Sequence, residues 1–390
     1  MKQPQKKQKI YRMQYSIFLE SSFHFTKLKY TLSQRDVMKK NTCLQRFLVF
    51  LVAVLLTCGC ETPQENTQEP PSTNRIQPLP PTAEILFLSN RDTGDRNKEI
   101  YSMDADGGNV TKLTYTDEHH FMVGIDNTQT YLVVTKAVKD TAAPKGLGDE
   151  DRKSLWAINL KTGEETRLTD PDNTAEGDSF SPDGEWIVFW MMIKGGKTSD
   201  IYKIRRDGSD LTRLTNTPGA HEFDPAWSNH GEKIAYNYYD TDIERFILKV
   251  MDIDGKNVET LYDGGTGVAT EYFPPGNYDP SWSPDDQWIV FERAITYDEE
   301  NGKAGVWHIL KVRSDGSEVH NLSEIGGHNS NAEYLPSYSP DGNFIVFSCR
   351  YGPKDPAKVE LNIFIMDCNG GSLKQLTDSP YWDDGAVWIK

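Results

Sequence analysis

The sequence has no apolar run of membrane-spanning length. Its longest uninterrupted run, Phe47–Leu56, covers ten residues, whereas a transmembrane helix needs about 20. Basic residues are also in deficit, with 42 Lys and Arg against 58 Asp and Glu, and residues 1–59 hold 11 of the former but only 2 of the latter. Because phosphate backbones bind clustered basic side chains, we expect no nucleic-acid partner. The charge leaves cations, basic peptides and neutral molecules as possible partners.

Cysteine is scarce as well, with five residues in the chain. Cys349 is expected on one strand of a hairpin and Cys368 just past its partner strand, so the register separates them by roughly 17 Å. A disulfide needs Cα atoms within about 7 Å of each other. We therefore predict that both thiols are unpaired.

Motifs of common enzymes are missing. The sequence contains no Gly-x-Ser-x-Gly elbow, no His-Glu-x-x-His and no phosphate-binding glycine-rich loop. The turns at Asp104, Asp252 and Asp367 resemble calcium loops, but they lack the third carboxylate and the distal Glu that such loops need. The sequence therefore leaves catalysis uncertain and favours a protein that is not an enzyme.

The segment after Met38 is typical of a secretion signal. A basic start precedes the apolar run Phe47–Leu56 and the sequence Thr57-Cys-Gly-Cys. Cys60 resembles the lipidated cysteine of bacterial lipoproteins, although Thr57 stands where that pattern prefers Leu, which leaves Cys58 as an alternative. We expect a lipid anchor at Cys60 and a location in the periplasm or at the cell surface.

The chain divides into four parts. Residues 1–37 have no core pattern and read as an upstream extension, and residues 38–59 form the lipoprotein signal peptide. Residues 60–83 are rich in Pro, Gln, Thr and Glu and nearly free of aliphatic residues, so they are expected to be a disordered tether. Residues 84–390 carry the periodic apolar pattern of a folded domain.

This domain is built from a repeated unit of four short strands. The 16 Phe, 18 Tyr, 9 Trp and 30 Gly residues already favour many strands joined by turns. The first strand ends in an aromatic residue and leads into a turn whose Pro, Asp and Gly reverse the chain. The clearest turns are Phe180-Ser-Pro-Asp-Gly, Trp227-Ser-Asn-His-Gly, Trp282-Ser-Pro-Asp-Asp and Tyr338-Ser-Pro-Asp-Gly.

The other three strands of the unit recur six times. The second and third strands begin with aliphatic residues, and the fourth is centred on a leucine. The second strands start at Ile85, Leu132, Ile187, Ile234, Ile289 and Ile345, and the leucines are Leu113, Leu168, Leu214, Leu261, Leu322 and Leu376. Four strands in 40 to 60 residues make a propeller blade. The sequence thus predicts an all-β, six-bladed β-propeller.

The two ends of the domain complete one repeat. The first repeat lacks its first strand, and the carboxy-terminal Ala386-Val-Trp388 has the pattern of that strand, with Trp388 in the place of Trp227 and Trp282. We therefore expect the C-terminal strand to close the ring as the innermost strand of the first blade.

The repeat resembles the TolB-type propeller, whose hallmark is the aromatic-Ser-Pro-Asp-Gly turn before a strand. The likeness covers residues 84–390. It implies the propeller fold, but the activity stays open because such propellers serve as binding platforms, peptidase gates and lyases. The tether also replaces the extra amino-terminal domain of TolB-like proteins, which puts their translocation role in doubt.

A binding site is expected where the six innermost strands meet. The residue before the terminal aromatic or Ile is small in most repeats, as suits strands crowded around an axis: Gly124, Ser179, Ala226, Ser281, Ser337 and Val387. Four positions earlier, a mostly acidic collar is expected at one mouth of the channel, with Glu176 beside Ala175 in the repeat where that position is alanine. Its expected members are His120, Glu176, Glu222, Asn277, Glu333 and Asp383. They suit a cation, an amino group or a basic peptide, unless they are simply polar residues at strand entrances.

The same loops supply two candidate metal ligands, His221 and His328, but their spacing follows no ligand motif. We expect no cofactor, with a divalent cation as the alternative. The favoured function is a non-catalytic, monomeric envelope lipoprotein that holds a protein, peptide or glycan. The alternative is a metal-assisted polysaccharide lyase or hydrolase with its site at the channel mouth.

Overall fold

The computed structural model describes residues 75–93, 97–116, 118–137, 152–265, 275–295, 306–328, 332–350 and 360–389. They belong to one compact unit that includes residues 73–390. The expected extension, the signal peptide, Cys60 and residues 60–74 of the expected tether lie outside the described residues. Within the described ranges the only helix is α2 (Leu322–Ile325), so the expectation of an all-β domain is confirmed.

Apart from the pair of β1 (Arg75–Ile76) and β5 (Thr114–Tyr115), we divide the strands of the described residues into six antiparallel groups of four, named groups 1 to 6 along the chain. Group 1 contains β26 (Asp383–Trp388), β2 (Ile85–Ser89), β3 (Glu99–Met103) and β4 (Thr111–Lys112), in this order. Group 2 contains β6 (His120–Ile125), β7 (Tyr131–Ala137), β8 (Lys153–Asn159) and β9 (Glu165–Arg167). Group 3 contains β10 (Thr174–Phe180), β11 (Trp186–Met192), β12 (Asp200–Arg205) and β13 (Thr212–Arg213).

The remaining groups repeat this order. Group 4 contains β14 (His221–Trp227), β15 (Lys233–Asp240), β16 (Arg245–Asp252) and β17 (Glu259–Tyr262). Group 5 contains β18 (Asn277–Trp282), β19 (Trp288–Ala294), β20 (Trp307–Arg313) and β21 (Val319–Asn321). Group 6 contains β22 (Ala332–Tyr338), β23 (Phe344–Arg350), β24 (Asn362–Asp367) and β25 (Lys374–Gln375). Groups 5 and 6 belong to one eight-stranded sheet, because β20 and β22 pair in parallel at Trp307 and Ala332.

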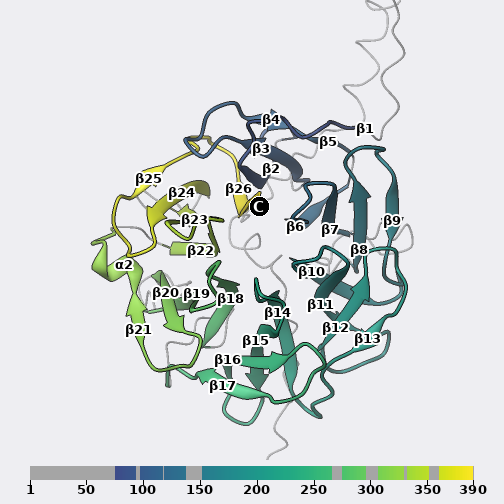
Figure 1. Ribbon diagram of the computed structural model, residues 1–390, viewed down its shortest axis with the longest axis vertical. Coiled ribbons are helices and arrows are strands. Elements are labelled where there is room, and N and C mark those ends of the chain that lie inside the picture. Colours follow the sequence, from purple (N-terminus) through teal and green to yellow (C-terminus); the bar gives the residue numbers. More distant parts are fainter. Residues whose placement is uncertain are drawn as a thin grey trace, which may run out of the picture. The chain divides into compact units, whose positions relative to one another are not determined.

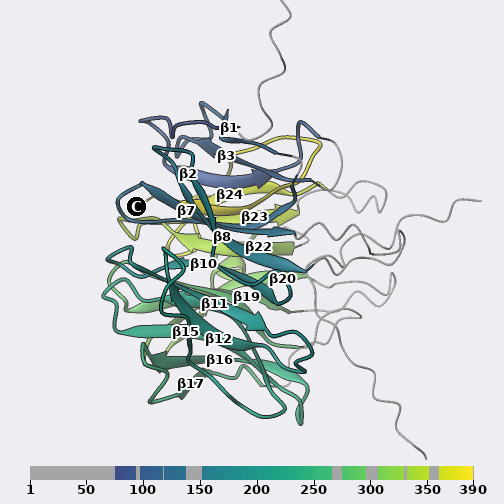
Figure 2. The same ribbon diagram turned by 90° about the vertical axis from the view of Figure 1, so that its right-hand side faces the viewer.

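The first strand of each group lies nearest a common centre (Figure 1). The C-terminal β26 pairs with β2, with Ile85 opposite Trp388 and Leu86 opposite Val387. Strands of the first and last groups also lie side by side in the second view (Figure 2). The expected partner of the last strand is therefore the one observed.

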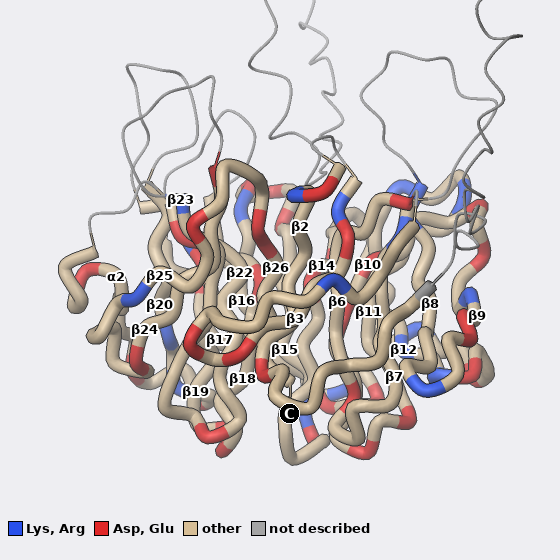
Figure 3. The backbone as a smooth tube through the Cα atoms, turned by 90° about the horizontal axis from the view of Figure 1, so that it is seen from above, with Lys and Arg blue, Asp and Glu red and all other residues tan. Residues whose placement is uncertain are grey.

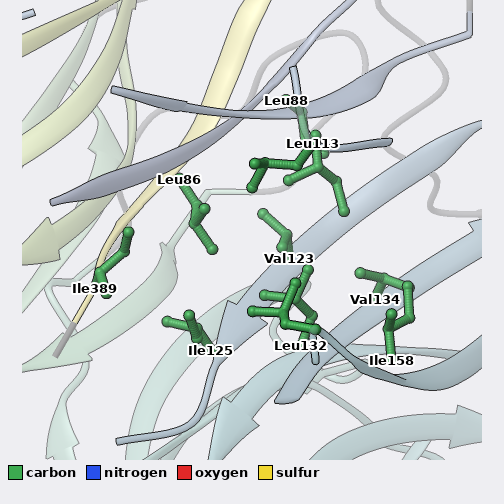
Figure 4. Packing of buried hydrophobic residues seen from close by; sticks show 11 residues of the cluster. Leu86, Leu88, Leu113, Val123, Ile125, Leu132, Val134, Ile158 and Ile389 are labelled. Atoms are coloured by element: carbon green, nitrogen blue, oxygen red, sulfur yellow. The ribbon is translucent and has the colours of Figure 1, made fainter. Parts of the chain in front are cut away.

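Apolar side chains from neighbouring groups fill the space between them. In Figure 4, Leu86, Leu88 and Leu113 of the group 1 segment face Val123 and Leu132 of group 2. Leu86, Leu88, Leu113 and Leu132 are fully buried. Burial of each such side chain contributes about 1.5–3 kcal/mol, so the contacts between groups are a main source of stability.

The folded region begins earlier than expected. β1 (Arg75–Ile76) pairs with β5 (Thr114–Tyr115), and Ile76, Leu79 and Ala83 pack against the core that groups 1 and 2 share. The expected tether contains few aliphatic residues, and Ile76 and Leu79 are two of them. Their burial extends the folded domain to Arg75 and removes residues 75–83 from the tether.

The fourth strands are shorter than expected, because most of them end before the leucine on which each was predicted to be centred. In group 5 the strand ends at Asn321, and Leu322 instead begins α2, where the Asn321 side chain accepts a hydrogen bond from the backbone N–H of Glu324. As expected from their register, Cys349 and Cys368 are not joined in a disulfide. Among the described residues, no helix is long and apolar enough to cross a membrane.

Candidate functional site: the central cavity

A cavity of about 510 Å³ lies where the innermost strands of the six groups meet. All six small residues expected at the axis line it. A Cβ added at Gly124 would stand 1.8 Å from the carbonyl oxygen of Asp178 in the next group. Only glycine leaves room for this approach, so the crowding expected from the sequence is confirmed.

The innermost strands are interrupted by a bulge where they line the cavity. The register shifts between Phe223 and Ala226 in β14, and at matching places in β10, β18 and β22. Three bulge residues, Asp224, Asp279 and Leu335, have left-handed φ angles of 48°, 50° and 54°. Bulges redirect side chains and are common beside functional sites. They turn these three residues into the cavity lining.

The lining differs from one side to the other. Groups 3, 4 and 5 contribute the carboxylic acids of this lining, namely Glu176 and Asp178, Asp224, and Asp279. The equivalent stretches of groups 6, 1 and 2 are apolar: Leu335 and Pro336, Gly385 and Ala386, and Met122 and Val123. The cavity can therefore contact a positive group and an apolar group at the same time.

Two buried acids at this side have a raised pKa. Burial, with a further contribution from Glu176, raises the pKa of Asp178 to about 7. Glu292 does not line the cavity. Burial raises its pKa to about 8, and the negative charge of Asp224 raises it further. Glu292 also accepts a hydrogen bond from the backbone N–H of Leu335. A cation in the cavity would favour the ionised forms of these acids.

Aromatic side chains line one part of the cavity. They are Phe180, Trp227, Trp282, Tyr338 and Trp388, the residues that end the innermost strands. The Trp282 indole N–H donates to the Ala226 carbonyl oxygen at 3.1 Å, and the Trp227 backbone N–H donates to the Ser179 hydroxyl at 2.8 Å. Both bonds join neighbouring groups, and the first one holds the Trp282 ring in place.

The six residues expected to form a collar lie at the start of the innermost strands, and all are buried. Glu176 forms an ion pair with Lys153 at 2.5 Å. Asp383 accepts hydrogen bonds from Ser89 at 2.5 Å and Arg91 at 2.9 Å. Of the six, only Glu176 also lines the cavity.

The other members of the expected collar are also held inside the protein. His120 Nδ1 lies 2.7 Å from the Lys98 carbonyl oxygen, and Asn277 accepts from Arg293 at 2.8 Å. Glu333 accepts hydrogen bonds from its neighbours. The Glu222 backbone N–H donates to the Ser199 carbonyl oxygen at 3.0 Å, and neither of its side-chain oxygens has a hydrogen-bond partner among the described residues. His120, Glu176 and Glu333 thus bond to the group before their own. Asp383 is instead held by Ser89 and Arg91 of its own group.

The two candidate metal ligands are placed differently from each other. The half-buried His221 ring stacks on Phe223 with an interplanar angle of 4°, and burial lowers its pKa. His328 lies 2.9 Å from both Glu333 and the Gly370 carbonyl oxygen, one at each ring nitrogen. Within the described ranges, no group of three or more His, Cys, Asp or Glu residues could hold a metal ion.

Comparisons with known proteins match this geometry. The family model described as the TolB beta propeller domain matches residues 145–293. TolB from Acinetobacter baumannii superposes with a TM-score of 0.56 at 16% identity, over 79% of this chain and 66% of that chain. A putative TolB from Agrobacterium tumefaciens gives a TM-score of 0.51 at 19% identity, over 79% and 99% of the two chains. The chain carries a TolB-like β-propeller.

Curated relatives match this chain over part of their length. An uncharacterized protein of Agrobacterium fabrum is 34% identical over 36% of this chain and 46% of its own length. A TolB homolog of Chlorobium luteolum is 28% identical over 49% of this chain and 36% of its own. An uncharacterized peptidase of Bacillus subtilis is 23% identical over 66% and 34%. The TolB-like propeller thus spans less than half of each of these relatives.

Sequence reasoning missed the acids that line the cavity of the TolB-like propeller. Asp224 and Asp279 each precede a proline on an innermost strand, and Asp178 stands in the proline position of its repeat. An Asp-Pro pair inside a strand argues against regular pairing, because proline has no N–H to donate to the ladder. That signal was available in the sequence and could have located the bulge.

Proposed function

We propose that this TolB-like propeller is a non-catalytic binding scaffold whose cavity holds part of a protein, peptide or glycan partner. The two-sided lining carries this proposal, because acids on three consecutive groups face apolar residues on the other three. A rigid surface of this kind binds a segment that presents a positive charge next to an apolar group. The similarity to TolB proteins supports a scaffold role by analogy.

Charge supports the choice of partner. Asp and Glu occur along both the upper and the lower edges of the strand groups in Figure 3, and the chain carries a formal charge of −16. Such a surface attracts cationic partners and repels nucleic acid. A basic or amine-bearing ligand is therefore favoured over a phosphate-bearing one.

The six groups act, in this proposal, as six blades of a closed, monomeric ring. Pairing of β26 with β2 supports closure, because it places the end of the chain beside the first complete strand. Closure removes the exposed strand edge that would otherwise recruit a second copy. Sedimentation of the purified domain should give the mass of one chain.

Lipidation at Cys60 would keep the scaffold at the membrane, in the periplasm or at the cell surface. The apolar run before Cys60 and the acidic domain after it support this placement. Radiolabelled palmitate should be incorporated by the native chain and by Cys58→Ser, but not by Cys60→Ser. Labelling that survives Cys60→Ser and disappears with Cys58→Ser would move the anchor.

The scaffold role is tested by changing the cavity without changing the surface. The Asp178→Asn/Asp279→Asn variant should lose at least about tenfold of the affinity for a partner that the native chain retains from solubilised envelopes. The exposed double variant Asp207→Asn/Asp254→Asn serves as the charge-matched control. Equal retention by all three proteins would contradict the proposal. Release of unsaturated sugars from envelope polysaccharides by the native chain would favour the lyase alternative instead.

A further inference from the structure

The acids that line the central cavity differ in how the fold holds them. Glu176 forms an ion pair with Lys153 at 2.5 Å. Asp224 accepts a hydrogen bond from the Asn237 side-chain amide at 3.0 Å. Asp279 is only 8% exposed. These three acids are therefore paired or covered by the protein itself, which leaves them less free to bind a ligand.

Asp178 is the cavity acid whose charge the fold leaves uncompensated. It lines the cavity from β10 and keeps part of its surface open there. Within the described residues no side chain donates a hydrogen bond to its carboxylate, and its own backbone N–H is the one donor that acts on it. A carboxylate in such a place gains more from a cationic ligand than one that is already paired.

The lining supplies no positive charge of its own. In the described part of the chain it contains four carboxylic acids and no Lys, Arg or His. Two further acceptors are the hydroxyls of Ser281 and Ser337, which line the same cavity and have no side-chain hydrogen-bond partner among the described residues. The free polar groups of the cavity are therefore few, and all of them can accept a hydrogen bond.

The apolar part of the lining suits an alkyl chain. Met122, Val123, Leu335 and Ala386 stand on the groups that carry no cavity acid. A lysine side chain combines a flexible four-carbon stem with an ammonium group that has three donors. A guanidinium group has five donors, and a saccharide has hydroxyls on every side, so both would leave polar groups unpaired in this cavity. The lining therefore fits lysine best.

We propose that Asp178 anchors the ammonium group of a lysine side chain that a protein partner inserts into the central cavity, with the alkyl stem against the apolar wall. This inference rests on the proposed scaffold role and deepens it, because it names the partner's group and the residue that binds it. The ammonium group donates a charge-assisted hydrogen bond to the ionised carboxylate. Its other N–H groups bond to the Ser281 and Ser337 hydroxyls directly or through water.

The test titrates n-butylammonium, which has the stem and the head group of a lysine side chain, into the native protein at pH 8.5. The carboxylate is ionised there, because the pKa of Asp178 is about 7. The dissociation constant should be on the order of 1 mM. Asp178→Asn should weaken binding by at least about tenfold. Asp207→Asn removes an exposed acid that does not line the cavity, so this charge-matched control should bind like the native protein.

Two further measurements separate an anchor from a structural residue. Asp178→Asn removes a buried charge without breaking a pair, so it should melt no lower than the native protein. The uncharged n-butanol should bind the native protein at least about tenfold more weakly than n-butylammonium, and this comparison needs no variant.

Three results would overturn the proposal. They are equal binding of n-butylammonium by native protein and Asp178→Asn, equal binding of n-butanol and n-butylammonium by native protein, and stronger binding of glucosamine or n-butylguanidinium than of n-butylammonium. The scaffold role fails separately, when the cavity variant Asp178→Asn/Asp279→Asn retains the envelope partner as well as the native chain does.

Discussion

His328 is a buried ring whose two nitrogens both face acceptors. Its partners are the Glu333 carboxylate and the Gly370 carbonyl oxygen. Two acceptors require two N–H donors, which only the charged imidazolium provides. Burial opposes this charge, but the hydrogen bond and negative charge of Glu333 outweigh it and raise the pKa of His328. The residue is thus a structural cation that joins groups 5 and 6.

The first prediction concerns the pH dependence of this pair. Because the folded pKa lies above the unfolded value of about 6.5, the stabilisation is complete below that value and is lost as pH rises through the folded pKa. His328→Gln should cost roughly 3 kcal/mol at pH 6 and less at pH 9, measured by urea unfolding. A constant difference for His328→Gln would show that charge is not involved.

A second prediction concerns Glu292. Burial raises the pKa of this residue to about 8. The folded protein keeps a proton on Glu292 between pH 4.5 and 8 that the unfolded chain releases, so stability falls as pH rises through this window. Glu292→Gln still accepts from the Leu335 N–H and should reduce this fall, with a higher melting temperature than the native protein above pH 8. The exposed variant Glu259→Gln should follow the native curve. Parallel curves for Glu292→Gln and the native protein would contradict the assignment.

At the scale of elements, β26 supplies the innermost strand of group 1 by pairing with β2. Trp388 is 7% exposed, and the Ile389 N–H donates to the Glu84 carbonyl oxygen at 2.8 Å. Removal of residues 386–390 should lower the melting temperature by more than about 10 °C or make the protein insoluble, since β2 becomes an open edge. Trp388→Ala should cost about 3–5 kcal/mol, and Trp388→Phe less than half of that. A truncated protein that melts within 2 °C of the native one would show that β26 is dispensable.

The strands could be predicted because each repeat states the same pattern. In Ile187-Val-Phe and Ile345-Val-Phe, successive side chains point to opposite faces of the strand, and both faces are apolar. A turn with Pro, Asp and Gly separates each segment from the strand before it. The edges of elements were harder to place. Arg75–Ile76 pairs with only two residues, and Leu322 changes from strand to helix because Asn321 caps it. Such choices depend on one or two contacts that the repeat does not encode.

The site was predicted less well than the fold. Alignment of the repeats placed Glu222 and Glu333 correctly at the start of innermost strands, but it could not show that the preceding group covers them. Burial arises from packing between groups that are about 50 residues apart in sequence. The acids that do line the cavity, such as Asp224 and Asp279, depend on a bulge and a left-handed backbone, which a periodic pattern hides.

At the scale of the whole molecule, the account depends on the first and last strands meeting. In the closed ring that we propose, this contact brings the six innermost strands to one axis and sets the acidic and apolar walls of the cavity on opposite sides. The charge of the domain then selects among partners, but only a closed arrangement gives the cavity a fixed shape.

Cross-linking of the first and last strands tests this most directly. Leu86 and Val387 are paired across β2 and β26, and paired Cα atoms lie within the reach of a disulfide. With Cys349 and Cys368 replaced by alanine, Leu86→Cys/Val387→Cys should oxidise to a link that keeps terminal fragments together after proteolysis. Leu86→Cys/Ser337→Cys should not, because Ser337 pairs with Val346 in group 6. Failure of the first pair to link, or equal linking by both, would contradict the closed propeller.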